Sequence, residues 1–172
     1  MMKLAATLMT AVLLSLSLAC SKQNDASYKE GVQRDLEQAD LKGVSVAEDK
    51  DKNTITLSGK LHSEDAKQQA AQVAQTAAGT RIVANEISVE PVGLESQAKQ
   101  ISSNLDDAIE SNYKASLIAH GLDKQNIDYK AKNGLLTLTG KVKTTQQRQQ
   151  AEQIAQAVPN VAQVLNQIEV KR

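Results

Sequence analysis

The sequence is poor in aromatic residues: it contains three Tyr and no Phe or Trp among 172 residues. A hydrophobic core must therefore be built from Val, Ile, Leu and Ala, and small modules with such cores have modest stability. The chain has one cysteine, Cys20, which excludes an internal disulfide. It has only two prolines, so rigid proline-rich segments are also excluded.

Neither sign of charge is in excess, because 20 Lys and Arg residues balance 20 Asp and Glu residues. This balance argues against a strongly basic nucleic-acid-binding protein, and we expect no nucleic-acid partner. The halves differ, however: residues 25–90 carry 8 basic and 12 acidic residues, whereas residues 98–172 carry 10 and 7. Either solvated surfaces have drifted apart in charge, or a basic second half faces an anionic surface.

The sequence also lacks the patterns that carry chemistry. There is no Cys/His cluster for a metal, no Gly-rich phosphate loop and no nucleophile elbow. His62 and His120 fall beside predicted helix ends, where surface positions are expected. We therefore expect a non-enzymatic protein with no catalytic residue, no metal and no cofactor.

The N-terminal segment resembles a bacterial lipoprotein signal. After Lys3, residues 4–19 are uncharged and rich in Leu and Ala, which is too short for a comfortable membrane span and typical of a signal peptide. The segment ends in Leu-Ser-Leu-Ala before Cys20, as in a lipobox, although Ser17 stands where that motif usually has Leu. The alternative is a plain secretory signal whose cleavage site lies near a cysteine.

These residues predict a signal peptide at 1–19 and a lipidated tether at 20–27, with Cys20 carrying the acyl chains, palmitate among them. Ser21 follows the cysteine where Asp would signal retention in the inner membrane. By the sorting rule of Gram-negative lipoproteins, this implies a lipid anchor in the outer membrane that faces the periplasm. Several acyl chains give stable anchoring where one chain does not.

The rest of the chain is an internal repeat with an offset of 81 residues. Residues 54–89 and 135–170 are identical at fourteen of thirty-six positions without a gap, including Gly59 with Gly140. Such a match indicates duplicated structural units. Because each copy has about 65–70 residues, each is expected to be a small domain rather than a solenoid repeat. We place the modules at residues 28–90 and 95–172, joined by a linker at 91–94.

Hydrophobic periodicity gives each module the order helix–strand–strand–helix–strand. The predicted fold class is α+β, with two tandem modules whose three-stranded mixed sheets are covered on one face by two helices. A continuous third strand is expected at 82–89, and the first helix of the second module should bury one apolar stripe. The members of that stripe are Ile101, Leu105, Ile109, Tyr113 and Leu117.

Two glycines and two asparagines recur at equivalent places. Gly59 and Gly140 fall on the inward face of the central strand, where a missing side chain allows a close approach. Asn85 and Asn166 recur within the third strand, where an amide that satisfies backbone groups is expected.

The third strand of each copy carries a family resemblance. Residues 79–89 read Gly-Thr-Arg-Ile-Val-Ala-Asn-Glu-Ile-Ser-Val, and residues 160–170 read Asn-Val-Ala-Gln-Val-Leu-Asn-Gln-Ile-Glu-Val. With the preceding strand that ends in Gly-Lys and the Ala- and Gln-rich helix, they resemble the BON-domain family. The lipobox makes the chain similar to dual BON-domain outer-membrane lipoproteins of the osmotically inducible periplasmic and nodulation type.

This resemblance implies a non-enzymatic role in envelope integrity or stress tolerance through binding of anionic phospholipid or a membrane surface. It also implies phospholipid contact by the first helix of the second module, at about residues 98–119, which includes Lys114. The alternative is a periplasmic interaction or holdase module that acts on outer-membrane or other periplasmic proteins.

A second candidate surface follows from strand alternation. Lys130, Lys132, Lys141 and Lys143 are expected on the outer face of the second sheet, where they would meet anionic head groups. An ordinary solvated sheet face is the alternative, because antiparallel hairpins commonly leave one side polar.

Overall fold

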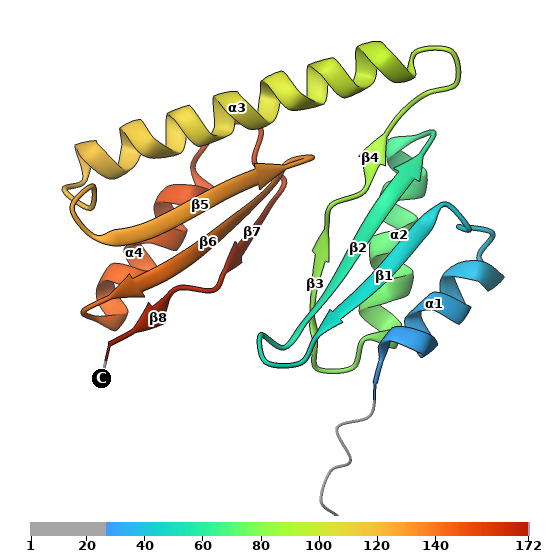
Figure 1. Ribbon diagram of the computed structural model, residues 1–172, viewed down its shortest axis with the longest axis horizontal. Helices are drawn as coiled ribbons and strands as arrows, with labels where there is room; N and C mark the ends of the chain where they lie inside the picture. The colour runs from blue at the N-terminus through green and yellow to red at the C-terminus, as the bar shows by residue number, and fades with distance from the viewer. Residues whose placement is uncertain (1–26, 172) are drawn as a thin grey trace, which may run out of the picture.

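Two modules with the same order of elements follow one another along residues 27–171, the part of the chain that the computed structural model describes (Figure 1). The first contains α1 (Lys29–Gln38), β1 (Val44–Asp49), β2 (Thr54–Leu61), α2 (Glu64–Ala77), β3 (Ile82–Asn85) and β4 (Ser88–Val89). The second contains α3 (Glu95–Ala119), β5 (Asn126–Lys132), β6 (Leu135–Val142), α4 (Thr145–Gln156), β7 (Gln163–Asn166) and β8 (Glu169–Val170). The predicted α+β class with tandem modules is confirmed.

Each module is built around one mixed sheet. In the first, β1 and β2 form an antiparallel hairpin, and β2 pairs in parallel with β3 and β4. The second repeats this pairing with β5, β6, β7 and β8. Because α2 and α4 each connect two parallel strands, the apolar sides of these helices pack back onto the sheet.

The third strand of each module is divided, where the sequence predicted one continuous strand. Asn85 accounts for the break: its side-chain Oδ1 accepts a hydrogen bond from the Ile87 N–H at 3.2 Å, and its Nδ2 donates to the Lys67 carbonyl at 3.3 Å. Asn166 makes the same two bonds, with Ile168 and Arg148. The repeated amides therefore satisfy backbone groups where the strand bends, as expected.

The cores are mainly aliphatic. Val32, Leu36, Ile55 and Leu57 of the first module are completely buried. In the second core, the Tyr113 hydroxyl donates a hydrogen bond to the Ala151 carbonyl at 3.2 Å. Its ring meets the ring of Tyr129 edge-on, with 5.1 Å between centroids. Two of the three tyrosines thus serve the second core, and burial keeps the pKa of Tyr113 above its usual value.

The modules touch through the outer faces of their sheets. Ala84, Leu135 and Leu165 form a small buried cluster there. Beside it, the Gln163 side chain pairs with the edge of β3: Nε2 donates to the Val83 carbonyl at 2.6 Å, and Oε1 accepts from the Asn85 N–H at 3.1 Å. A side-chain amide therefore takes the place of a further strand on this edge.

Asn133, in the turn between β5 and β6, uses all four of its polar groups: two bind α3 of its own module and two bind the first module. Its N–H donates to Asp106, and its side-chain oxygen accepts from the Ser102 hydroxyl, both at 2.8 Å. Its side-chain NH₂ donates to the Glu86 carbonyl at 2.8 Å, and its own carbonyl accepts from Lys67 at 2.9 Å. Glu86 and Lys67 belong to the first module, so this turn is a fixed point between the two.

Only the second half of α3 enters a core, although the sequence predicted a stripe along most of its length. Ile109, Tyr113 and Leu117 are buried, whereas Ile101 and Leu105 are 60% and 42% exposed. The reason is that α3 is longer than the sheet it covers. Its first half extends beyond the second module and over the end of the first, next to β4 (Figure 1).

Candidate functional site

The lysines predicted on the outer sheet face do not gather into one patch. Lys132 lies opposite Leu135 at the hairpin turn, whereas Lys141 lies opposite Asn126 at the other end of the hairpin. The end with Lys132 packs against the first module, because its Nζ lies 2.7 Å from a Glu86 oxygen. This part of the outer face is therefore a contact between modules rather than an open surface.

Three of the five candidate lysines are paired with carboxylates. The ammonium groups of Lys130, Lys132 and Lys141 lie 2.8, 2.7 and 2.9 Å from oxygens of Glu110, Glu86 and Glu169. These lysines keep exposed stems, but each positive charge is balanced within the protein. Their electrostatic attraction for an anionic surface is correspondingly reduced.

The pair of Lys130 and Glu110 also serves the fold. Burial opposes ionisation of Glu110, but hydrogen bonds from Lys130 and from the Ala131 N–H hold the pKa of its carboxyl below the usual value. The same bond raises the pKa of Lys130. Ala131 lies on the outer edge of β5, so the Glu110 carboxylate caps a backbone group that would otherwise face solvent.

Lys114 and Lys143 differ from the other three lysines. Within residues 27–171, neither has a carboxylate at salt-bridge distance. Lys143 follows β6, and its backbone N–H bonds to Gln147 at the start of α4. Gln147 is uncharged, so it does not balance the positive charge of the Lys143 ammonium group.

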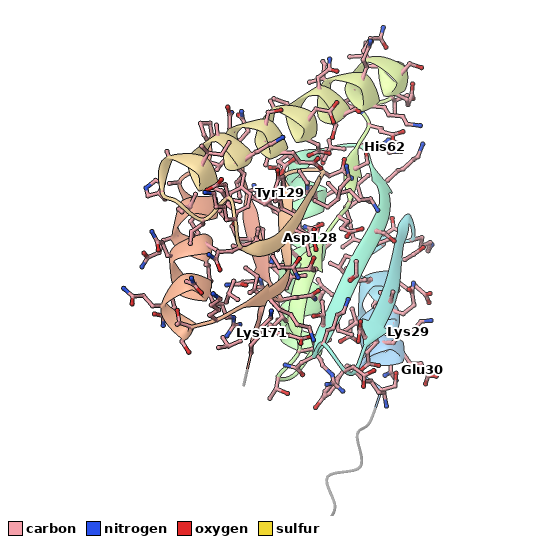
Figure 2. All side chains as sticks on the ribbon, turned by 60° about the vertical axis from the view of Figure 1, so that its left-hand side comes forward. Lys29, Glu30, His62, Asp128, Tyr129 and Lys171 are labelled. Carbon is pink, nitrogen blue, oxygen red and sulfur yellow. The ribbon has the colours of Figure 1, made fainter. Side chains whose placement is uncertain are left out.

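Lys114 lines a cavity of about 350 Å³ at the C-terminal end of α3, and its polar lining also includes Asp123 and Gln125. Leu117, Leu122, Ile127 and Tyr129 form apolar walls, and Figure 2 shows Tyr129 on the strand beneath the helix. Ile118, which also lines this cavity, is 56% exposed. Ile118 lies one turn after Lys114, so a cation and an exposed apolar side chain share one face. This pairing is the candidate site.

Sequence reasoning named Lys114 but missed Ile118 and the cavity. Ile118 lies one residue beyond the predicted apolar stripe, which ends at Leu117 and is buried there. The sequence carried no clear signal for Ile118, because adjacent helical residues can both face one core, as Ile154 and Ala155 do in α4.

The structure assigns no chemistry to the histidines. His62 Nδ1 lies 2.9 Å from the Glu90 carbonyl, and His120 Nδ1 lies 2.8 Å from the Ser116 carbonyl. Across residues 27–171, no cluster of three or more His, Cys, Asp or Glu side chains has the arrangement of a metal site. In the same range, no helix has the length and apolar character needed to cross a membrane. Cys20 and the predicted signal peptide lie outside the described residues.

A duplicated α+β module with two helices on one sheet face defines the class of fold to which this chain belongs. The chain belongs to the BON-domain family, whose model matches residues 24–91 and 105–172. The two matches confirm the duplication that the repeat predicted.

A curated relative is the osmotically-inducible protein Y of Escherichia coli strain K12, which is 28% identical over 132 residues. The match covers 76% of this chain and 64% of that protein, so the chain spans less than two thirds of the relative's length.

Two solved structures of CdsD, a structural protein of the type III secretion system of Chlamydia trachomatis, also match. The first, of its C-terminal domain, has a TM-score of 0.32 and 17% identity, with 83% of this chain and 67% of that chain covered. The second has a TM-score of 0.37 and 11% identity, with 83% and 91% covered.

Proposed function

We propose that this protein is a non-enzymatic envelope lipoprotein, anchored through Cys20 to the outer membrane and facing the periplasm. Its second BON module binds an anionic phospholipid surface and thereby supports outer-membrane integrity or stress tolerance. The lipobox-like segment supports the anchor, and a relative named for osmotic induction supports the link with stress.

The observation that carries the lipid proposal is the pairing of Lys114 with Ile118 beside an apolar cavity. A lysine near an anionic surface contributes about 1 kcal/mol. Burial of an exposed aliphatic side chain in the interface adds about 1–2 kcal/mol. The combination suits the boundary between head groups and acyl chains, where a cation and an apolar group are stabilised together.

The charge distribution favours the second module as the one that meets an anionic surface. The second half of the chain has an excess of basic residues, and Lys114 and Lys143 are the candidate lysines without an ion pair among the described residues. Lys130, Lys132 and Lys141 act instead as parts of the scaffold, because each is bound to a carboxylate of the same chain.

The proposal predicts salt-sensitive co-sedimentation of the chain from Ser21 onward with phosphatidylglycerol vesicles, and weak binding to phosphatidylcholine vesicles. The double variant Lys114→Gln, Ile118→Ser should weaken binding at least about tenfold. The matched control removes Lys141 together with its partner (Lys141→Gln with Glu169→Gln) and should change binding little, because the net charge stays the same.

Failure of the wild-type chain to bind any anionic vesicle would reject the lipid role. Equal losses in the control and the double variant would reject the site. The anchor is tested separately in cells: globomycin, which blocks cleavage of lipoprotein signals, should leave the chain unprocessed. A processed chain with an unmodified Cys20 would remove the anchor from the proposal.

A further inference from the structure

An apolar groove runs along the first half of α3, away from the Lys114 cavity. Seven apolar residues line it: Val89, Pro91, Ala98, Ile101, Leu105, Ile109 and Ala162. Its volume is about 420 Å³, within the range of about 300–1,000 Å³ that is usual for binding pockets. At 1.5 Å per helical residue, Ile101 and Ile118 are about 25 Å apart, so the groove and the cavity are separate surfaces.

Exposed apolar side chains are concentrated beside this groove. Among the described residues, six large apolar side chains are exposed, and four of them lie between residues 92 and 105. Val92 is 77% exposed and Leu94 is 53% exposed, and both lie in the linker just before α3. Exposed apolar residues gathered around a concave surface are typical of an interaction site.

The charged residues that line the groove carry a net charge of −1, because two carboxylates face one lysine. Three charged residues line it: Glu64, Lys67 and Asp106. Lys67 is turned inward, because its Nζ donates to the Asn133 carbonyl at 2.9 Å and burial lowers its pKa. Asp106 accepts hydrogen bonds from the N–H groups of Asn133 and Gly134. Glu64 remains exposed at the rim, followed by exposed Asp65.

We propose that this groove binds a basic amphipathic helix of a partner protein, with its apolar side chains against Ile101 and Leu105 and its Lys or Arg side chains against Glu64. The helix-in-groove mode fits a wall that is itself a helix with apolar residues one turn apart. The acidic rim selects for a cationic partner and repels an anionic bilayer. This interaction is additional to the proposed lipid contact at the other end of α3.

The groove also lies at the end of the first module that is remote from the start of α1. His62 bonds to Glu90, immediately before the linker to α3, and Figure 2 shows His62 and Lys29 at opposite ends of the module. In a chain tethered before Lys29, this end is presented to other proteins.

The test uses the chain from Ser21 onward and a short fluorescein-labelled Leu/Lys helical peptide with Leu on one face. Anisotropy should show binding that weakens as salt is added, and a Leu/Glu peptide of the same pattern should bind at least about tenfold more weakly. Ile101→Ser should reduce affinity about tenfold through lost apolar contact, and Glu64→Lys should reduce both affinity and salt dependence.

Ile82→Ser is the matched control, because Ile82 is 47% exposed and lies outside the groove. It should leave peptide affinity unchanged, and Ile101→Ser should leave vesicle binding unchanged. Equal binding of both peptides, or equal losses in Ile82→Ser and Ile101→Ser, would overturn the proposal. A concentration-dependent dimer that Ile101→Ser abolishes, measured by sedimentation velocity, would overturn it in favour of a second copy of this chain.

Discussion

Gly59 and Gly140 occupy the same place in the two copies, one residue before the lysine near the end of the central strand. Both have positive φ, 121° and 106°. A Cβ at Gly59 would collide with the Gly43 carbonyl oxygen, and a Cβ at Gly140 with that of Asn126. Because the obstructing atoms are backbone, no side-chain rotation relieves the contact.

Gly140→Ala should therefore lower the free energy of unfolding by about 3 kcal/mol, from the unfavourable φ and the backbone collision together. Gly93→Ala is the control, since Gly93 also has positive φ, 81°, but no atom lies near its missing Cβ. That variant should lose only about 1–2 kcal/mol. Urea denaturation measures both, and equal losses would show that the backbone angle alone requires glycine.

At the scale of helices and strands, local sequence signals predicted most of the architecture. Ser63 accepts a hydrogen bond from the Ala66 N–H at the start of α2, which is the usual capping role of a serine before an acidic first turn. Asn133 and Gly134 both have positive φ, as a two-residue Asn-Gly hairpin turn requires. These features depend on residues close in sequence, which is why periodicity and turn chemistry were sufficient.

The lysine surface could not be predicted in the same way, because its ion pairs join distant residues. Lys130 pairs with Glu110 of α3, and Lys132 with Glu86 of the other module. Strand alternation gives the face on which a lysine lies, but not the helix or module that covers it. Glu110 lies in the second half of α3 and Glu86 lies between β3 and β4, so neither partner is close in sequence to the strand that carries the lysine.

The Glu110 carboxylate gives α3 a pH-dependent contact with β5. Because its folded pKa lies below the usual value of about 4.5, its contribution to stability is present above that pH and is lost as the pH falls through the folded pKa. The wild-type chain should therefore lose stability below about pH 4.5 more steeply than Glu110→Gln, which has no carboxylate to protonate. Urea denaturation at a series of pH values measures the two slopes, and parallel curves would contradict the assignment.

At the scale of the whole molecule, the repeat explains the modules but not their packing. Identical positions, such as Leu57 with Leu138 and Asn85 with Asn166, build the fold of each copy. The contact between modules depends on positions where the copies differ: Gln163 corresponds to Ile82, and Leu135 to Thr54. An interface between duplicated units therefore requires divergence, and the signal that reveals duplication carries no information about it.

A substitution at Asn133 tests whether the contact between the two modules makes them unfold together. Asn133→Gly keeps a residue suited to φ of 51°, but it removes the side-chain bonds to Ser102 and Glu86. At about 1 kcal/mol net for each bond, the free energy of unfolding should fall by about 1–3 kcal/mol, with a broader unfolding transition as the modules begin to unfold separately.

Asn160→Gly is the control: Asn160 has φ of 66°, and no side-chain bond is found for it within residues 27–171. Circular dichroism during urea unfolding distinguishes them. A cooperative transition unchanged in Asn133→Gly would show that the remaining contacts, namely the apolar cluster, the bonds of Gln163 and the pair of Lys132 with Glu86, suffice to couple the modules.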